Sequence, residues 1–326
     1  MNRIAEANVA TSAELLLQED DFVLTGHLHG DGDSIGSLLA LGQGLLAAGK
    51  KRVRLRADAV SPLYAFLPGV QLIETWQEGE AAPAVFVALD CATPERLSGG
   101  KDCFAGAAIT LNIDHHPGNT CFARYNWVEP TAAAVGEQVF LVLQAMGVKL
   151  DRDMATCLYT ALATDSGSFR YDSVTPRTHR IAAELLSCGA AAAAVNVALF
   201  ETRSLEQTKL LALALGTLTV SPGGKVAWLS ATRDMFAVAG SDDIETESLI
   251  SFARAISGVE VAILFREQAD GTVRVGLRAR HHVDVNSLAR QFGGGGHRKA
   301  AGCTLPGTIP VIRNQVVSAA RRAAND

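Results

Sequence analysis

The chain has 326 residues, which at roughly 150 residues per domain indicates about two domains. Hydrophobic residues make up 48% and charged residues 19%, a globular composition that argues against disorder and against a coiled coil. The 29 Lys and Arg against 34 Asp and Glu give a net charge of −5, so the chain has no global positive field for gripping long duplex DNA. A short or local phosphate ligand is compatible with this balance.

The six cysteines are spread along the chain without a Cys-x-x-Cys pair, and we interpret them as reduced thiols rather than as a disulfide framework. Residues 1–21 lack the apolar core of a signal peptide, and no apolar run reaches the roughly 18 to 20 residues of a membrane span. The sequence therefore predicts a cytoplasmic enzyme or binding protein with no membrane partner.

The first half of the chain alternates short apolar runs with helical stretches. We expect strands at residues 22–26, 53–57, 85–89 and 108–113. We expect helices at residues 34–49, 132–146 and 152–163. This alternation predicts an α/β domain with a doubly wound parallel sheet, whose ligand crevice lies at the carboxyl ends of the strands.

The second half predicts a smaller α+β domain. The helical pattern at 176–215 contains a polar stretch, residues 201–207, where we place the domain connection. Strands are expected at 217–221, 225–230, 259–265 and 273–278, with a hairpin turn at Asp270-Gly271, and helices at 246–256, 285–292 and 310–324. We therefore predict a catalytic domain at 1–195, a linker region at 196–215 and a substrate-binding domain at 216–326.

Acidic and imidazole side chains follow the predicted strands of the first domain. Because the carboxyl ends of parallel strands lie at one edge of a sheet, these side chains should converge. Four or more carboxylates meeting there would repel one another unless divalent cations neutralised them. The residues are His27, Asp31 and Asp33 after the first strand, Asp90 after the third, Asp114, His115 and His116 after the fourth, and Asp165 at the end of a later helix.

Single members of this set have simpler explanations. Asp33 could be only the N-cap of the next helix, Asp90 could cap a turn, and Asp165 alone would be an exposed acid at a helix end. Coincidence explains the whole set poorly, so we predict a site for two divalent metal ions. Carboxylate and imidazole ligands without cysteine favour Mn²⁺, with Mg²⁺, Co²⁺ or Zn²⁺ as alternatives.

The loop around these aspartates contains further candidates. We expect Gly30 and Gly32 to let the loop bend so that both aspartates can face one site. His29 is interpreted as a solvated loop residue rather than as a metal ligand.

The triplet Asp114-His115-His116, together with the acidic residues before and after it, resembles the motifs of the DHH family of phosphoesterases. Residues 293–302, with the sequence GGGGHRKAAG, resemble the signature of the DHH-associated C-terminal domain. Both domains in this order resemble the nanoRNase/pAp phosphatase (NrnA-type) branch of the family. The resemblance spans essentially the whole chain.

The resemblance implies a role for each matching residue. The implied metal ligands are His27 and Asp31 for one Mn²⁺, Asp33 and His115 for the other, Asp90 as the bridge between both ions, and Asp165. Asp90 and His116 are the implied catalytic residues, with His116 at the substrate phosphate, and Asp114 would orient His115. The implied reaction is attack on phosphorus by water that two metal ions activate. His116 would stabilise the developing charge or protonate the leaving oxygen.

We expect the active site to lie in a cleft between the two domains. The second domain is expected to bind the end of the substrate that lies away from the metal site. The glycine run offers backbone N–H groups to an anion, and an alanine-rich, helix-like segment follows it. The resemblance also shows a departure, because relatives often have Ser near both Gly276 and Ala279, so hydroxyl contacts are not expected there. The predicted substrate-binding residues are Arg278, Arg280, Gly294, Gly295, Gly296, His297 and Arg298.

Aromatic residues and a histidine pair complete the candidates. Phe169 and Tyr171, beside Asp165, are candidates for nucleotide stacking. His281-His282 is expected in an exposed loop. The tryptophans, which we expect to pack in the interior, are Trp76, Trp127 and Trp228.

The family resemblance implies a Mn²⁺-dependent phosphohydrolase that degrades very short single-stranded oligoribonucleotides. The same enzyme would remove the 3′-phosphate of 3′-phosphoadenosine 5′-phosphate (pAp). A cyclic-dinucleotide or linear dinucleotide phosphodiesterase stays open, as does a homodimer. An inorganic pyrophosphatase is less favoured because no late Ser-Arg-Lys-Lys-like signature is found, and a RecJ-type exonuclease needs an added domain. A catalytically inactive nucleotide-binding protein is disfavoured because every expected ligand position is filled.

Overall fold

The computed structural model describes residues 5–240, 246 and 248–326. The chain divides into two compact units, Met1–Thr202 and Arg203–Asp326. Residues 1–4 of the N-terminal segment, and residue 247 of the helix predicted at 246–256, lie outside the described residues.

The first unit contains a seven-stranded sheet in which every neighbouring pair of strands is parallel. Strand β5 (Val85–Leu89) is apolar and buried along its whole length, as a central strand covered on both faces should be. Because β2 and β6 both pair with β5, the carboxyl ends of these three strands lie side by side. The order is β1 (Ala5–Glu6), β7 (Tyr125–Val128), β6 (Ile109–Asp114), β5, β2 (Asp21–Thr25), β3 (Arg52–Arg56) and β4 (Ile73–Glu74).

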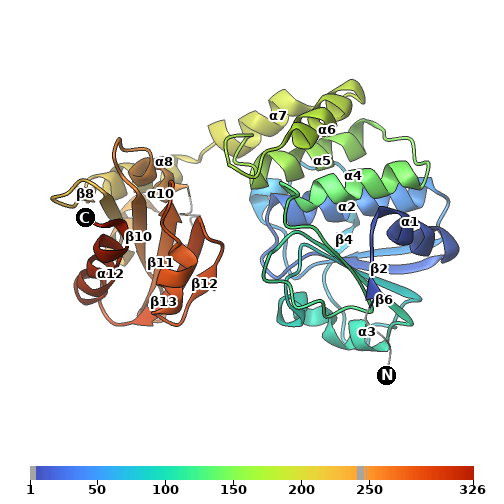
Figure 1. The fold of residues 1–326 in the computed structure, drawn as a ribbon, viewed down its shortest axis with the longest axis horizontal. Coiled ribbons are helices and arrows are strands. Elements are labelled where there is room, and N and C mark those ends of the chain that lie inside the picture. The colour runs from blue at the N-terminus through green and yellow to red at the C-terminus, as the bar shows by residue number, and fades with distance from the viewer. Residues whose placement is uncertain (1–4, 241–245, 247) are drawn as a thin grey trace. The chain divides into compact units, whose positions relative to one another are not determined.

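Helices cover both faces of this sheet, which confirms the predicted doubly wound α/β fold (Figure 1). One face carries α1 (Val9–Gln18), α2 (Gly32–Ala47) and α4 (Val135–Ala145). Outside them pack α5 (Arg152–Asp165), α6 (Pro176–Ser187), α7 (Ala192–Asn196) and a π-helical turn, Val197–Glu201. The other face carries α3 (Lys101–Gly106) and the short 3₁₀ helix Pro94–Gly100, and further 3₁₀ turns lie at Pro62–Tyr64 and Val70–Leu72.

Two glycines let α5 approach its neighbours closely. A Cβ atom on Gly36 of α2 would lie 2.5 Å from the Cys157 carbonyl oxygen, and one on Gly136 of α4 would lie 2.7 Å from the Cβ of Ala161. Any larger residue would therefore push α2 or α4 away from α5. This close packing matters for the site below, because α2 and α5 both carry predicted metal ligands.

Two expectations from composition can be compared with the described residues. All six cysteines are unpaired, as predicted. No single described helix is long and apolar enough to cross a membrane, although the bent pair Pro176–Ser187 and Ala192–Glu201, with 118° between its helices, has the length and composition of a broken span. In α6, Ile181 and Leu185 are buried in the core of the first unit.

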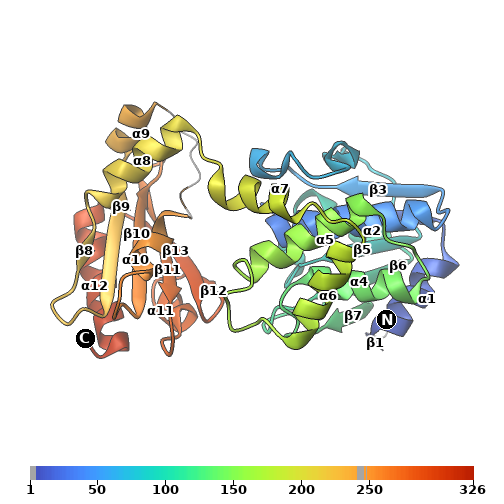
Figure 2. The same cartoon turned by 90° about the horizontal axis from the view of Figure 1, so that it is seen from above.

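The second unit folds around a six-stranded mixed sheet, which confirms the predicted α+β class (Figure 2). The strand order is β12 (Gly295–Gly296), β13 (Ala300–Pro306), β11 (Thr272–Ala279), β10 (Val261–Glu267), β9 (Val226–Ala231) and β8 (Thr219–Val220). One face packs against α11 (Val285–Arg290) and α12 (Ile309–Ala324). The other face packs against α8 (Leu205–Leu215), α9 (Arg233–Ala239) and α10 (Leu249–Arg254).

The strands and helices that were predicted with stated ranges all have counterparts, but the prediction differs from the structure in several places. It missed strands β1, β4, β7 and β12 and helices α1, α3 and α9. The alanine-rich segment after the glycine run is strand β13 rather than a helix, because it pairs with β11 and buries Ala301 and Cys303 on alternate positions. Part of the predicted linker is α8, whose Leu210 and Ala214 are fully buried in the second unit.

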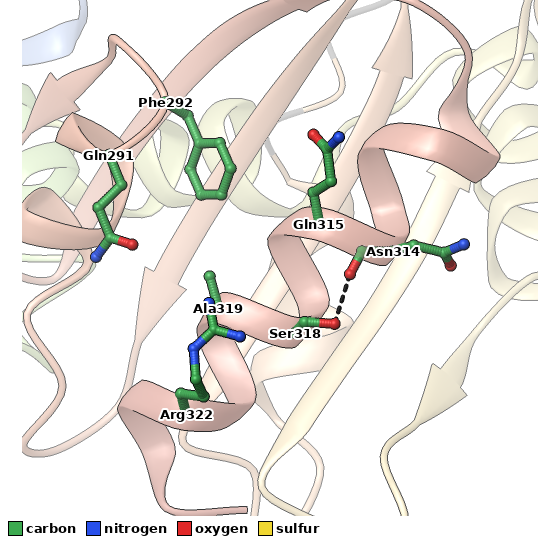
Figure 3. Close-up of a pocket in the computed structure, with 7 residues that line it drawn as sticks. All are labelled: Gln291, Phe292, Asn314, Gln315, Ser318, Ala319 and Arg322. Carbon is green, nitrogen blue, oxygen red and sulfur yellow. Dashed lines mark hydrogen bonds between the residues drawn. The ribbon is translucent and has the colours of Figure 1, made fainter.

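A groove of about 570 Å³ lies between α12 and the end of α11 (Figure 3). Its lining includes the side chains of Gln291, Phe292, Gln315 and Arg322. None of the predicted substrate-binding residues contributes to this groove.

Candidate metal centre

His27 and Asp31 lie in the loop between β2 and α2. The Nδ1 of His27 donates to the Leu28 carbonyl oxygen at 2.8 Å, which directs Nε2 toward carboxylates. This Nε2 lies 3.4 Å from Asp90 Oδ2 and 3.7 Å from Asp31 Oδ2. Asp31 is also the N-cap of α2, because its Oδ1 accepts from the backbone N–H groups of Asp33 and Ser34. The alternative in which Asp33 is only the N-cap is therefore wrong, because Asp31 caps the helix.

The bend of this loop does not come from its glycines. His29 is exposed and takes the left-handed conformation, with φ of 56°, whereas neither Gly30 nor Gly32 has a positive φ. Gly32 is required for another reason, because a Cβ atom there would collide with the side chain of Thr164 at the end of α5. The glycine thus brings the start of α2 against the end of α5, next to Asp165.

Asp33 is completely buried in the first turn of α2. Its carboxylate accepts from the backbone N–H groups of Val135 at 2.6 Å and Gly136 at 2.9 Å, at the start of α4. Ser37 Oγ donates to it at 3.0 Å. Asp33 is therefore held rigidly, with Oδ2 4.0 Å from the Nε2 of His115.

Asp90 directly follows β5 and is only 3% exposed. Its backbone has a φ of 58°, a left-handed conformation that is unusual for a residue with a side chain. Its Oδ1 is buried without a hydrogen-bond partner among the described residues. A buried carboxylate oxygen without a partner is strongly unfavourable, and a bound cation would satisfy it.

The triplet at the end of β6 is arranged differently from the prediction. We expected Asp114 to orient His115, but Asp114 Oδ1 accepts from the Nδ1 of His116 at 2.7 Å. His115 instead donates from Nδ1 to the Ala132 carbonyl oxygen at 3.1 Å. Asn119 donates to the other oxygen of Asp114 at 2.5 Å. Asp114 is thus fixed from both sides, and it fixes His116.

These side chains form three groups whose candidate ligand atoms lie within 4.8 Å of one another. Asp90 and His115 each belong to two of the groups, so they join the whole set. The Nε2 of His115 lies 3.3 Å from Asp165 Oδ2 and 3.7 Å from Asp90 Oδ1. The groups are His27, Asp31 and Asp90; Asp33, His115 and Asp165; and Asp90, His115 and His116.

The crowding of like charges changes the protonation of the site. Burial and the Asp90 carboxylate raise the pKa of Asp33 to about 7, and burial and Asp33 raise the pKa of Asp165 well above its ordinary value. Burial opposes the charge on His27, but the carboxylates of Asp31 and Asp90 raise its pKa to about 10. These shifts show that negative charge is crowded at one place, and the oxygen and nitrogen donors there are of the kind that bind divalent cations.

Two of the arginines predicted to bind substrate lie on β11 of the second unit or just after its end. Arg278 is opposite Ala262 of β10, on the face that packs against α8, α9 and α10. Its Nη1 donates to the Leu277 carbonyl oxygen at 3.2 Å. Arg280 is exposed, and its Nη1 donates to the Ile256 carbonyl oxygen at 3.3 Å.

The glycine run is largely engaged in the sheet. Gly295 and Gly296 form β12 and pair with β13, and the N–H of Gly294 donates to the Ala289 carbonyl oxygen at 3.0 Å. The N–H of His297 donates to the Ala300 carbonyl oxygen at 2.7 Å. The predicted anion nest thus has fewer N–H groups to offer than the sequence indicates. His297 and Arg298 are exposed.

The two departures on β11 face opposite sides of the sheet. Ala279 is 2% exposed in the core beneath α11 and α12, whereas Gly276 lies on the other face, near Ile250. Two hydroxyl groups at these positions would not point to one ligand.

The aromatic candidates differ in their surroundings. Phe169 stacks on His179 with ring centroids 5.5 Å apart and packs against the core, so its ring has neighbours already. Tyr171 is 41% exposed and covers Gly167.

His281 and His282 are exposed, and their backbone N–H groups donate to Glu260. The predicted packing of the tryptophans is confirmed, because Trp76, Trp127 and Trp228 all belong to or contact apolar clusters.

Several groups that hold the candidate ligands were missed in the sequence. They are Asn119, the carbonyl group of Ala132 and the first N–H groups of α4. A backbone group leaves no signature in a sequence. Glu137 did leave one, because it is a charged residue inside an otherwise mostly apolar helix.

Comparisons with known proteins agree with this fold and site. A model of the DHH family N-terminal domain matches residues 21–162, and a model of the DHHA1 domain matches residues 235–325. A Thermus thermophilus protein named bifunctional oligoribonuclease and PAP phosphatase NrnA is 33% identical over 289 residues, 89% of this chain and 85% of that protein. The chain therefore belongs to the DHH family of phosphoesterases, as the motifs predicted.

Other relatives extend this likeness. The NrnA protein of Bacillus subtilis is 28% identical over 291 residues, covering 88% of this chain and 90% of that protein. A crystal structure described as an exopolyphosphatase-related protein from Bacteroides fragilis matches with a TM-score of 0.89 and 25% identity, covering 97% of this chain and 95% of that one. RecJ from Thermus thermophilus in complex with Mn²⁺ shares the fold, with a TM-score of 0.55, 16% identity and coverage of 96% of this chain and 55% of that one.

Proposed function

We propose that this protein hydrolyses very short single-stranded oligoribonucleotides and removes the 3′-phosphate of pAp. The observation that carries the proposal is Asp90, whose buried Oδ1 has no hydrogen-bond partner among the described residues and lies where the carboxylates and imidazoles meet. The choice of substrates is supported by likeness over most of the chain to proteins named for both activities.

We propose that the site holds two divalent cations. Asp90 would lie between them, because it belongs to groups on both sides of the site. The donor set suits Mn²⁺, with Mg²⁺, Co²⁺ or Zn²⁺ as alternatives. Such cations, when bound, supply a water nucleophile near neutral pH and stabilise negative charge on phosphoryl oxygens. The other proposed ligands are His27 and Asp31 for one cation and Asp33, His115 and Asp165 for the second.

We assign proton transfer and substrate contact to His116. Burial opposes ionisation of Asp114, but its hydrogen bond with His116 lowers the pKa of Asp114, so this carboxylate stays negative. A negative Asp114 keeps the proton on Nδ1 of His116 and fixes the direction of the ring. When the ring of His116 also carries a proton on Nε2, this N–H group would give that proton to the leaving oxygen or stabilise charge on the phosphate, and the ring would keep its Nδ1 proton.

In the second unit we propose that substrate phosphates contact Arg278, which lies on β11, and Arg280, which follows the end of that strand. The exposed segment 295–298, which includes His297 and Arg298, would add to this contact. A guanidinium group suits a phosphate because it can donate two hydrogen bonds to it.

The direct test is a parallel assay after removal of bound metal with a chelator. The substrates are pAp, di- to pentaribonucleotides, pGpG, cyclic di-AMP and pyrophosphate, each with Mn²⁺, Mg²⁺, Co²⁺ or Zn²⁺ added back. We expect phosphate release from pAp and nucleotide release from the short RNAs, both only after metal addition. Hydrolysis confined to cyclic di-AMP or pyrophosphate, or activity that persists in the chelator, would contradict the proposal.

A further inference from the structure

An ion pair between a buried Glu137 and a partly exposed Arg177 joins the start of α6 to the start of α4. Glu137 is completely buried, and its Oε2 accepts from the Nε of Arg177 at 2.7 Å. Its Oε1 accepts from Thr178 Oγ1 at 2.5 Å. The Nη1 of Arg177 also donates to Glu129 at 2.5 Å. One arginine on α6 therefore connects two acids at either end of a short segment, residues 129–137.

This segment contacts two of the candidate metal ligands. The carbonyl oxygen of Ala132 accepts from Nδ1 of His115, and the N–H groups of Val135 and Gly136 donate to Asp33. These three groups belong to the backbone, so their positions depend on how the segment is held. The Ala133 N–H, between them, donates to Glu137 at 3.4 Å, which ties the segment to the ion pair.

We infer that Arg177 and Glu137 are positioning residues, which place Asp33 and His115 for one of two metal ions by holding residues 129–136. The inference depends on the proposed metal centre. A charged pair is not needed merely to fill this space, because apolar residues of similar volume are often as stable in a protein interior. Groups that hydrogen-bond to metal ligands do need fixed positions, because they orient the ligands. Their loss commonly weakens metal binding 10- to 100-fold.

The ion pair of Arg177 and Glu137 supports candidate ligands on one side of the site only. His27 is held by the Leu28 carbonyl group, and Asp31 is held by the N–H groups that it caps. None of these bonds involves residues 129–137. A positioning role therefore predicts an effect on one of the two metal-binding steps, whereas general loss of structure would weaken both.

The experiment is a titration of metal-free protein with Mn²⁺, without substrate, followed by calorimetry and by electron paramagnetic resonance of free Mn²⁺. For Arg177→Ala we expect one binding step to weaken about tenfold and the other to stay within about twofold. Glu137→Gln keeps the volume and an acceptor, so a smaller weakening of the same step is expected. Arg180→Ala is the matched control, because Arg180 is exposed on the same helix.

The outcomes separate this inference from the proposed function. If the natural protein does not bind two Mn²⁺ ions, the proposed metal centre is wrong. If it binds two and both variants titrate like the natural protein, or lose both steps equally, the positioning role is wrong. Circular dichroism and the melting temperature of the metal-free proteins check folding, and Glu137→Gln decides the question if Arg177→Ala does not fold.

Discussion

The two units place their polar side chains in different ways. In the first, β2, β5 and β6 are adjacent and parallel, so the residues that follow them meet at one edge of the sheet. In the second, β11 pairs antiparallel with both neighbours, and its side chains alternate between two faces. In a parallel sheet, a residue that directly follows a strand can therefore be expected near residues that follow the adjacent strands. For a motif in a hairpin, the sequence does not say on which face of the sheet each side chain lies.

The charges of the two units differ as well. Residues 1–202 contain 14 Lys and Arg and 23 Asp and Glu, a net charge of −9, and residues 203–326 contain 15 and 11, a net charge of +4. The negative balance suits a unit that gathers cations, and the positive balance suits one that meets an anionic substrate. This contrast supports the proposal that the first unit binds the metal ions and the second unit binds the substrate, and the following variants test it.

Asp90→Ala should have the strongest effect on the first unit. We expect kcat to fall on the order of 10³-fold or more, because metal ions contribute several kcal/mol of charge stabilisation. The measurement is phosphate release from pAp at saturating Mn²⁺. Asp58→Ala is the control, because Asp58 is an exposed acid just after β3, which is separated from β5 by β2. Unchanged turnover of Asp90→Ala would remove the basis of the proposed site.

His116→Ala should lower kcat by about 10²-fold or more, the usual contribution of a proton-transfer group. Asn119→Ala should lower it about tenfold, because the side chain of Asn119 donates to Asp114, which in turn holds His116. Steady-state kinetics on pAp would give both values. A larger loss for Asn119→Ala than for His116→Ala would show that the order of this chain of contacts is wrong.

Stability of the metal-free protein should depend on pH through the first unit. The pKa of His27 is raised from 6.5 to about 10, so the stability that this shift provides is present below pH 6.5 and is lost as pH rises through 10. The raised pKa of Asp33, about 7, also stabilises the folded metal-free protein at low pH, and this contribution is lost as pH rises through 7. We expect the melting temperature to fall by several degrees between pH 6.5 and 10.

Two comparisons check this pH dependence by thermal unfolding. Saturating Mn²⁺ should reduce it, because ligands are already deprotonated when they bind metal. His27→Gln should reduce it too, whereas His29→Gln, at an exposed position, should keep it. An equal fall in melting temperature for the natural protein, His27→Gln and His29→Gln would mean that groups other than His27 cause the loss of stability.

Arg278→Ala and Arg280→Ala should have the smallest effects. We expect KM to rise about tenfold or less with kcat within about twofold, since a phosphate contact away from the reacting atoms adds binding without speeding the reaction. Arg313→Ala on α12, on the opposite face of the unit, is the control. A fall in kcat with unchanged KM would place these arginines at the reacting phosphate instead.

The sequence predicted some parts of each unit and not others. Strands β2, β3, β5 and β6 of the first unit could be predicted from apolar runs, and most of the candidate ligands from their places after those runs. The partner of Asp114 could not, because the choice between His115 and His116 depends on the direction of each side chain. Strand β13 was missed because its residues, rich in Ala and Gly, form a strand only by pairing with β11.

The order of residues along the chain was enough to indicate an α/β unit with acids and imidazoles at one edge, because a parallel sheet turns position after a strand into position in space. The bonds that hold those residues came from packing between distant segments. Asp33 meets the start of α4, 102 residues later, only because small residues let α2, α4 and α5 approach one another. Such a contact depends on distances between helices, which no local pattern records.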